Sequence, residues 1–131
     1  MKRVVVTGMA GISPVGNDWP SMLAKLKLQT NAVQRIAEWD EYSDLNTRIG
    51  APAAAFELPT HYTRKVTRGM GRVALMAVRA SELALEDAGL LNDPWIKSGE
   101  VGVSYGSSSG SPNAISDFGQ MRNNKKVEGI N

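Results

Sequence analysis

Residues 71–89 have the sequence GRVALMAVRASELALEDAG, and they carry the strongest secondary-structure signal in the chain. Apolar residues recur there every three or four positions, which is the spacing of an amphipathic helix. These residues are Val73, Met76, Ala77, Ala80, Leu83, Ala84 and Ala88. Gly89 follows the last of them, as a left-handed helix cap does, so we predict a helix over residues 71–88. Its alanines leave a narrow face that another backbone can approach closely, in a buried core or at an interface.

Two further segments have the pattern of buried strands. Residues 3–8 place three consecutive valines before Thr7-Gly8, and residues 101–106 form a second run that ends in glycine. Runs of β-branched residues closed by glycine are typical of strands. With the long helix between them, they predict an α/β fold with parallel pairing.

The rest of the chain is less strongly patterned. Residues 21–28 predict a short amphipathic helix, and Asn17 or Asp18 is placed to cap its N-terminus. Residues 29–60 are expected to form an excursion over the body of the domain, with a short strand around residues 48–50. No internal repeat or low-complexity linker is visible.

The composition narrows the class of protein. Apolar residues make up 42% of the chain and charged residues 21%, as in globular proteins. No run is long enough to span a membrane. The apolar run at residues 4–6 is too short for a signal peptide, so we expect a cytoplasmic protein. A net charge of +2 does not indicate nucleic acid as a partner.

The chain has no cysteine and one histidine, His61. It therefore offers no disulfide, no thiolate nucleophile and no cysteine-bound metal. One histidine cannot build a metal cage or a two-histidine catalytic pair, and we interpret His61 as a surface or capping residue. We expect no metal and no organic cofactor.

The glycine-rich loop after the first predicted strand raises one alternative, a nucleotide-binding oxidoreductase. Thr7-Gly8 is similar to the start of the short-chain dehydrogenase motif, but Ile12 stands where that motif needs glycine. Pro14 also removes an amide that a phosphate cradle would use. Tyr62 and Lys65 are one residue too close to form a Tyr-x-x-x-Lys pair. These departures weigh against nicotinamide binding.

Three blocks of residues resemble the β-ketoacyl-acyl-carrier-protein synthases, in that family's order and spacing. The first block is VVVTG at residues 4–8 followed by SPVGN at residues 13–17, and the second is ALEDAGL at residues 84–90. The third is VGV at residues 101–103, which leads into a turn with two further glycines. The set covers nearly the whole chain and resembles the N-terminal part of an elongating, synthase II-like condensing enzyme. Two departures are Ala10, where the family has glycine, and a serine-rich turn in place of a glycine-rich one.

The resemblance implies a thiolase-like αβαβα fold of two similar halves, and a homodimer. Residues 1–131 would form part of the first half. The implied activity is that of an acyltransferase in fatty acid biosynthesis. It is a decarboxylating Claisen condensation of an acyl group with malonyl-acyl carrier protein.

The same resemblance bears on catalysis. The family's nucleophile is a cysteine at a helix N-terminus, and two histidines stabilise the developing negative charge. The resemblance places all three after Asn131, so we expect no catalytic residue in this chain and no activity from it alone. A non-catalytic partner subunit that sets chain length, like the cysteine-less relatives, is the alternative.

A basic cluster precedes the long helix: Arg64, Lys65, Arg68 and Arg72. The three arginines of this cluster follow one another at intervals of four residues, so a continuous helix would put them on one face. The resemblance implies that Arg64, Lys65 and Arg68 dock the acidic acyl carrier protein, because complementary charge speeds encounter and sets orientation. The alternative is an ordinary solvated helix start.

The serine-rich turn at residues 107–112 leads into a helix predicted over residues 113–121. The resemblance implies that Ser109 borders the acyl pocket, at a position where relatives carry a bulky apolar residue. A small hydroxyl there would change the volume and polarity of the pocket. The alternative is a plain turn, with Ser111 as the helix N-cap and Pro112 in its first turn.

Overall fold

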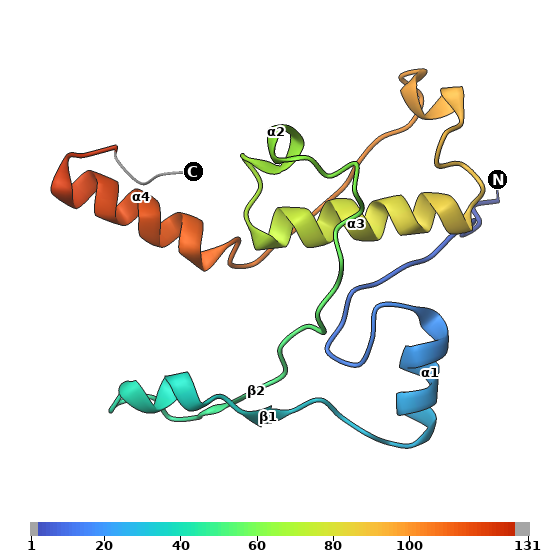
Figure 1. Ribbon diagram of the computed structural model, residues 1–131. Coiled ribbons are helices and arrows are strands. Elements are labelled where there is room, and N and C mark those ends of the chain that lie inside the picture. Colours follow the sequence, from blue (N-terminus) through green and yellow to red (C-terminus); the bar gives the residue numbers. More distant parts are fainter. Residues whose placement is uncertain (1–2, 128–131) are drawn as a thin grey trace. The chain divides into compact units, whose positions relative to one another are not determined.

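The computed structural model describes residues 3–127 of the chain. Its elements in chain order are α1 (Trp19–Lys27), β1 (Gln34–Arg35), η1 (Ala37–Glu41), β2 (Ile49–Gly50), α2 (Arg64–Thr67), α3 (Arg72–Asp87), η2 (Pro94–Lys97) and α4 (Pro112–Asn124), where η marks a 3-10 helix (Figure 1). These elements belong to two compact units. One unit is Ala10–Glu57, and the other is Met1–Met9 together with Leu58–Asn131.

The longest helix, α3, is the element around which the second unit is built. It begins after Gly71 and ends before Gly89, whose φ of 71° is the left-handed conformation that glycine adopts without strain. The Leu90 amide donates to the carbonyl of Leu85 at 2.8 Å, which satisfies a carbonyl that the helix end would otherwise leave unpaired. Both the predicted helix and its glycine cap are confirmed.

The N-terminal segment lies against the C-terminal half of α3. A β-carbon on Gly8 would be 2.3 Å from the carbonyl oxygen of Ala84 and 2.8 Å from the Cβ atom of Ala88. One residue later, the Met9 amide donates to Oδ2 of Asp87 at 2.8 Å. The narrow alanine face therefore admits another backbone, as the sequence predicted.

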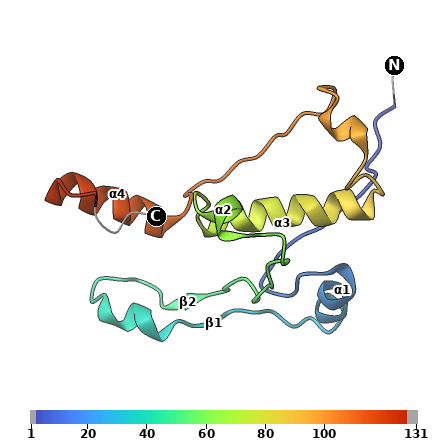
Figure 2. The ribbon, with the colours of Figure 1, turned by 45° about the horizontal axis from the view of Figure 1, so that its top comes forward.

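The two predicted strands of this unit do not form strands in the structure. Residues 3–8 and 101–106 make no β-ladder within the described residues, and Figure 2 shows both as irregular extended chain. Val4 is 94% exposed and Val103 is 86% exposed. The prediction of buried, parallel strands is thus wrong for this structure. Extended chain becomes a strand only when a neighbour accepts and donates its backbone hydrogen bonds.

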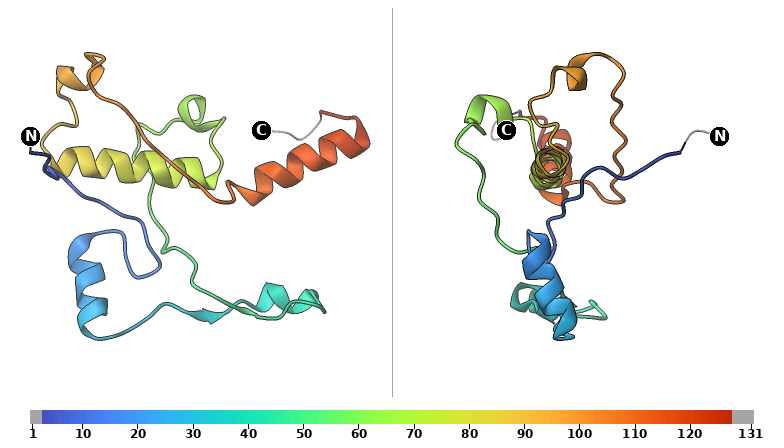
Figure 3. Two further views of the ribbon diagram at one scale, coloured as in Figure 1. Left: turned by 180° about the vertical axis from the view of Figure 1, so that it is seen from behind. Right: turned by 90° about the vertical axis from the view of Figure 1, so that its right-hand side faces the viewer.

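The second of these extended segments is tied to α3 by a side chain. Tyr105 donates its hydroxyl hydrogen to the carbonyl oxygen of Ala77 at 2.8 Å. The hydroxyl of Ser81 lies 3.0 Å from that of Tyr105 and donates to the same carbonyl at 2.9 Å. Residues 98–111 follow α3 back towards its N-terminal end, as the views of Figure 3 show.

The last helix, α4, is three residues longer at its C-terminal end than predicted. Ser111 does hold its N-cap position, with Pro112 directly after it, but the Ser111 side chain makes no capping hydrogen bond to α4. Its hydroxyl instead accepts from the amide of Val73 at 3.2 Å, in the first turn of α3. Gly71 cannot cap α3 because it has no side chain, so a serine from a distant turn fills that role.

In the unit Ala10–Glu57, β1 and β2 form a two-stranded antiparallel ladder, with Gln34 opposite Gly50 and Arg35 opposite Ile49. The strand expected around residues 48–50 is present. Its pairing is antiparallel, and no parallel ladder occurs within the described residues. Asp40 reinforces the ladder, since its carboxylate lies 2.8 Å from Arg35 and 3.2 Å from the Arg48 side chain.

The same unit contains α1, which confirms the short predicted helix. Asp18 is its N-cap and accepts from the Ser21 amide at 2.8 Å. This hydrogen bond to the backbone lowers the pKa of Asp18. Before it, Ser13 and Gly16 exchange backbone hydrogen bonds of 3.0 and 3.2 Å, and the Asn17 side chain donates to the Ala55 carbonyl at 2.7 Å. The SPVGN block is therefore hydrogen-bonded to residues 54–55, near the other end of this unit.

Within residues 3–127 no apolar side chain is fully buried, and no helix is long and apolar enough to cross a membrane. The three valines at residues 4–6 are 94%, 69% and 76% exposed. Contiguous apolar surface of this kind is typical of a face that another part of a protein covers.

Candidate functional site

The basic residues singled out in the sequence lie on two helices. Arg64 and Lys65 belong to α2, and Arg68 is its C-cap residue. Arg72 is the first residue of α3. Gly69 and Gly71 separate the two helices. The expectation that the three arginines at four-residue spacing share one continuous helical face is therefore wrong, because the helix is interrupted between Arg68 and Arg72.

Arg64, Lys65 and Arg68 nevertheless remain together on a single turn of helix, and we call them the basic face. All three are exposed, and within the described residues their side chains make no ion pair. Charges that are not neutralised by neighbours attract an oppositely charged surface over about 8 Å at physiological salt. The basic face is thus available to an acidic partner.

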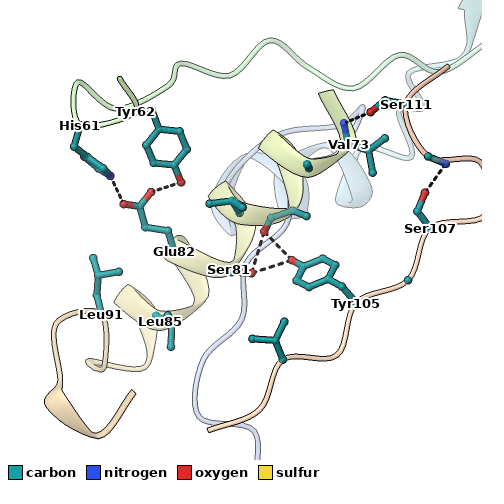
Figure 4. Close-up of a pocket in the computed structure, with 16 residues that line it drawn as sticks. His61, Tyr62, Val73, Ser81, Glu82, Leu85, Leu91, Tyr105, Ser107 and Ser111 are labelled. Carbon is teal, nitrogen blue, oxygen red and sulfur yellow. Dashed lines mark hydrogen bonds and ion pairs between the residues drawn. The ribbon is translucent and has the colours of Figure 1, made fainter. Parts of the chain in front are cut away.

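The two residues that lead into α2 are fixed to α3 by Glu82. Oε1 of Glu82 lies 2.6 Å from Nε2 of His61, and Oε2 accepts from the Tyr62 hydroxyl at 3.0 Å (Figure 4). Oε2 also accepts from Nη1 of Arg79 at 2.6 Å, one turn earlier on α3. His61 is 61% exposed, as expected of a surface histidine, whereas the Glu82 side chain is only 14% exposed.

These contacts set the charge state of the cluster. Burial opposes ionisation of Glu82, but hydrogen bonds from Arg79, Tyr62 and His61 outweigh it, so the pKa of Glu82 is lowered. A carboxylate accepts hydrogen bonds and cannot donate them, so Nε2 of His61 carries the hydrogen. Burial and the neighbouring carboxylate together raise the pKa of Tyr62. The cluster therefore holds an ionised Glu82 surrounded by three donors.

An open apolar groove of about 890 Å³ runs along α3 beside this cluster (Figure 4). Its apolar lining includes Val73, Ala77 and Leu85 of α3, and Val103 faces it from the extended segment. Tyr105 contributes a hydroxyl that is already bonded to α3. With this apolar lining, the groove offers a surface for packing or binding.

The serine-rich turn forms one end of the groove, but Ser109 does not line it. Gly106, Ser107, Gly110 and Ser111 are the lining residues of the turn, and Ser109 is exposed between them. Inside the turn, the Gly110 amide donates to the Ser107 hydroxyl at 2.9 Å. The structure thus brings Ser109 to the groove's border without placing it in the groove wall.

Sequence reasoning missed Glu82. Its spacing from Arg79, three residues on a predicted helix, is the signal that could have identified an ion pair. The contacts with His61 and Tyr62 join residues about 20 positions apart and have no signature in the sequence pattern.

Comparisons with known proteins point to the same family as the resemblance in the sequence. Residues 1–130 match the model of the family described as the β-ketoacyl synthase N-terminal domain. The crystal structure of a β-ketoacyl synthase from Burkholderia phymatum is 48% identical, with a TM-score of 0.90 over the whole of this chain and 32% of that one.

The chain is also similar to curated proteins named 3-oxoacyl-[acyl-carrier-protein] synthases. The 3-oxoacyl-[acyl-carrier-protein] synthase 1 of Haemophilus influenzae is 34% identical over 85% of this chain and 27% of its own length. Synthase 2 of Synechocystis is 33% identical over 88% of this chain and 27% of its own length. The chain therefore spans about a third or less of the relatives that it matches.

Proposed function

Because the chain belongs to the β-ketoacyl synthase family, we propose that it forms part of the N-terminal domain of a β-ketoacyl-acyl-carrier-protein synthase. Such an enzyme would condense an acyl group with malonyl-acyl carrier protein in fatty acid biosynthesis, with loss of carbon dioxide. The relatives are named for 3-oxoacyl-acyl-carrier-protein synthesis, which supports this substrate class. Membership of this family argues against the alternative hypothesis of a nucleotide-binding oxidoreductase.

The role of these 131 residues would be a framework and a landing surface, without turnover. One observation carries this part of the proposal: the sequence contains no cysteine. Without a sulfur nucleophile no acyl thioester forms on the polypeptide, and the condensation has no covalent intermediate to proceed from. The non-catalytic partner subunit remains the alternative, since it would share this property.

Acyl loading tests this role directly. The chain would be incubated with an acyl-acyl carrier protein and malonyl-acyl carrier protein, and then analysed by intact-mass spectrometry. We expect no mass increase on the chain and no two-carbon-extended product. An acylated chain together with an extended product would overturn the proposal.

We also propose that the basic face docks the carrier protein. Its three charges are exposed and lie on one short helix, which supports a contact with an acidic helix. Arg68→Glu should weaken carrier affinity roughly threefold at low salt, because an exposed ion pair contributes up to about 1 kcal/mol. Lys25→Glu, an equal charge reversal on α1 in the other unit, is the control. Equal affinity of Arg68→Glu and the unaltered chain at low salt would contradict docking here.

Ser109 would tune the acyl pocket of the intact synthase, by which we mean the proposed enzyme with these residues in its N-terminal domain. Ser109 lies in the turn that ends the groove, which supports a place at the pocket border. Ser109→Ile should shorten the acyl chains that the intact synthase accepts, since a bulky side chain fills volume. An unchanged chain-length profile would count against it.

The finer architecture follows from the same resemblance. We propose that the intact synthase has the layered αβαβα fold, forms a homodimer and works in the cytoplasm. The close fit to the Burkholderia phymatum enzyme supports the thiolase-like fold. The apolar surface along residues 4–6 supports burial against further elements of that fold.

A further inference from the structure

Glu82 is the point where three hydrogen-bond donors from two separate segments converge, and two of those donors, His61 and Tyr62, lie in the segment that leads into the basic face. We infer that Glu82 is a positioning residue for carrier docking: it holds the start of α2, and with it the basic face, against α3. This inference rests on the proposed function, because it concerns how the docking surface is presented. Glu82 itself would not touch the carrier protein.

The first argument is that α2 cannot hold its own position. It has four residues, and a single helical turn is unstable in water without outside contacts. At its C-terminal end it is joined to α3 through Gly69, around which there is open space, and Gly71. Glycine is the residue that restrains the backbone least. That connection alone would let α2 change its orientation.

The second argument is that the restraint at the other end passes through Glu82. His61 and Tyr62 stand three and two residues before Arg64 and reach the two carboxylate oxygens separately, at 2.6 and 3.0 Å. The rings of His61 and Tyr62 also meet edge to face, 4.9 Å apart. Two donors on two oxygens fix the direction of the segment as well as its distance from α3.

The third argument is electrostatic. An acidic residue close to a basic face would weaken its attraction for an acidic partner, but Glu82 is largely shielded from solvent and paired with Arg79. The i, i+3 spacing keeps Arg79 and Glu82 together on α3 whether or not α2 is present. Glu82 can thus anchor His61 and Tyr62 while contributing little negative charge to the surface.

The test measures affinity for an acyl carrier protein, together with the NMR signals of the His61 and Tyr62 rings. The variants are Glu82→Ala, Glu82→Gln and Arg68→Glu. Glu86→Ala is the matched control: it removes the same charge one turn later on α3, where the side chain is exposed and has no partner within the described residues. Circular dichroism reports whether each variant keeps its helices.

We expect Glu82→Ala to weaken carrier binding about threefold and to shift both ring signals, while Glu86→Ala does neither. Glu82→Gln keeps one accepting oxygen, so it should restore part of the affinity. If Arg68→Glu weakens binding and Glu82→Ala does not, the inference is wrong and docking stands. If Arg68→Glu also has no effect, docking itself fails, and the inference with it. If Glu82→Ala loses helical structure, the carrier affinity of Glu82→Gln is the deciding measurement. An affinity between those of the unaltered chain and Arg68→Glu supports a positioning role for Glu82, and an unaltered affinity overturns it.

Discussion

The two ends of α3 are held in different ways. At the C-terminal end, the backbone at Gly8 packs on Ala84 and Ala88, and no side chain could be inserted between them. At the N-terminal end, Gly71 faces a side chain, Ser111, whose hydroxyl also caps the helix. The first end depends on backbone packing, and the second depends on side-chain hydrogen bonds.

This difference matters because only the second end lies next to the basic face. Backbone packing leaves little freedom, since the atoms that touch belong to a helix that cannot shift without losing its own hydrogen bonds. Side-chain hydrogen bonds are weaker and can be exchanged for water. We therefore expect substitutions at the Gly8 contact to affect stability most, and those at the N-terminal end of α3 or in the Glu82 cluster to affect the presentation of α2.

The largest effect is expected at Gly8. In Gly8→Ala, the new β-carbon would approach the Ala84 carbonyl to 2.3 Å, and the helix backbone cannot yield. Overpacking of this kind costs about 3 kcal/mol. Thermal unfolding followed by circular dichroism measures the cost. Gly102→Ala is the control, because a β-carbon there meets nothing within 4 Å. Equal melting temperatures of Gly8→Ala and Gly102→Ala would refute the close packing of Gly8 on α3.

A smaller effect is expected at Gly71, and it should be reversible. In Gly71→Ala, the β-carbon would lie 2.4 Å from the hydroxyl oxygen and 2.7 Å from the Cβ atom of Ser111. We expect a cost of about 2 kcal/mol. Since the clash is with a side chain, Ser111→Gly should remove at least half of that cost, as a double-mutant cycle would show. Additive costs in the double variant would mean that the two residues do not meet.

Sequence reasoning succeeded where the signal was local. Gly89 and Asp18 mark helix ends through conformations and hydrogen bonds that span a few residues, and both helices are present. It failed for residues 3–8 and 101–106, because strand formation depends on a neighbouring strand and not on the segment alone. The candidate site divides in the same way. The basic face was visible as a charge pattern, whereas Glu82 gains its role from contacts made across about 20 residues.

The middle of α3 offers a third, weaker restraint. Tyr105→Phe would remove the hydrogen bond to the Ala77 carbonyl, which already accepts from Ser81. We expect a cost of about 0.5 kcal/mol, the low end for a hydrogen bond on a half-exposed residue. Tyr42→Phe is the control, because the hydroxyl of Tyr42 has no partner in the part of the chain that the structure describes. A cost no larger than that of the control would show that Tyr105 does not restrain the extended segment.

Acid should distinguish two contacts of α3, the side-chain cluster at Glu82 and the backbone packing of Gly8, with the smallest effect of all. The pKa of Glu82 is below its ordinary value of 4.5, so its contribution is fully present above that value and is lost as the pH falls through the lowered pKa. The backbone packing of Gly8 on Ala84 and Ala88 contains no titrating group, and an Asp87→Asn background removes the neighbouring carboxylate that accepts from the Met9 amide. In NMR spectra recorded from pH 6 downwards, the Tyr62 ring should therefore shift before the Gly8 amide does. Glu82→Gln should abolish that early shift, because the glutamine amide does not titrate. If the Gly8 amide moves first, the Glu82 cluster is not the more easily loosened of the two contacts.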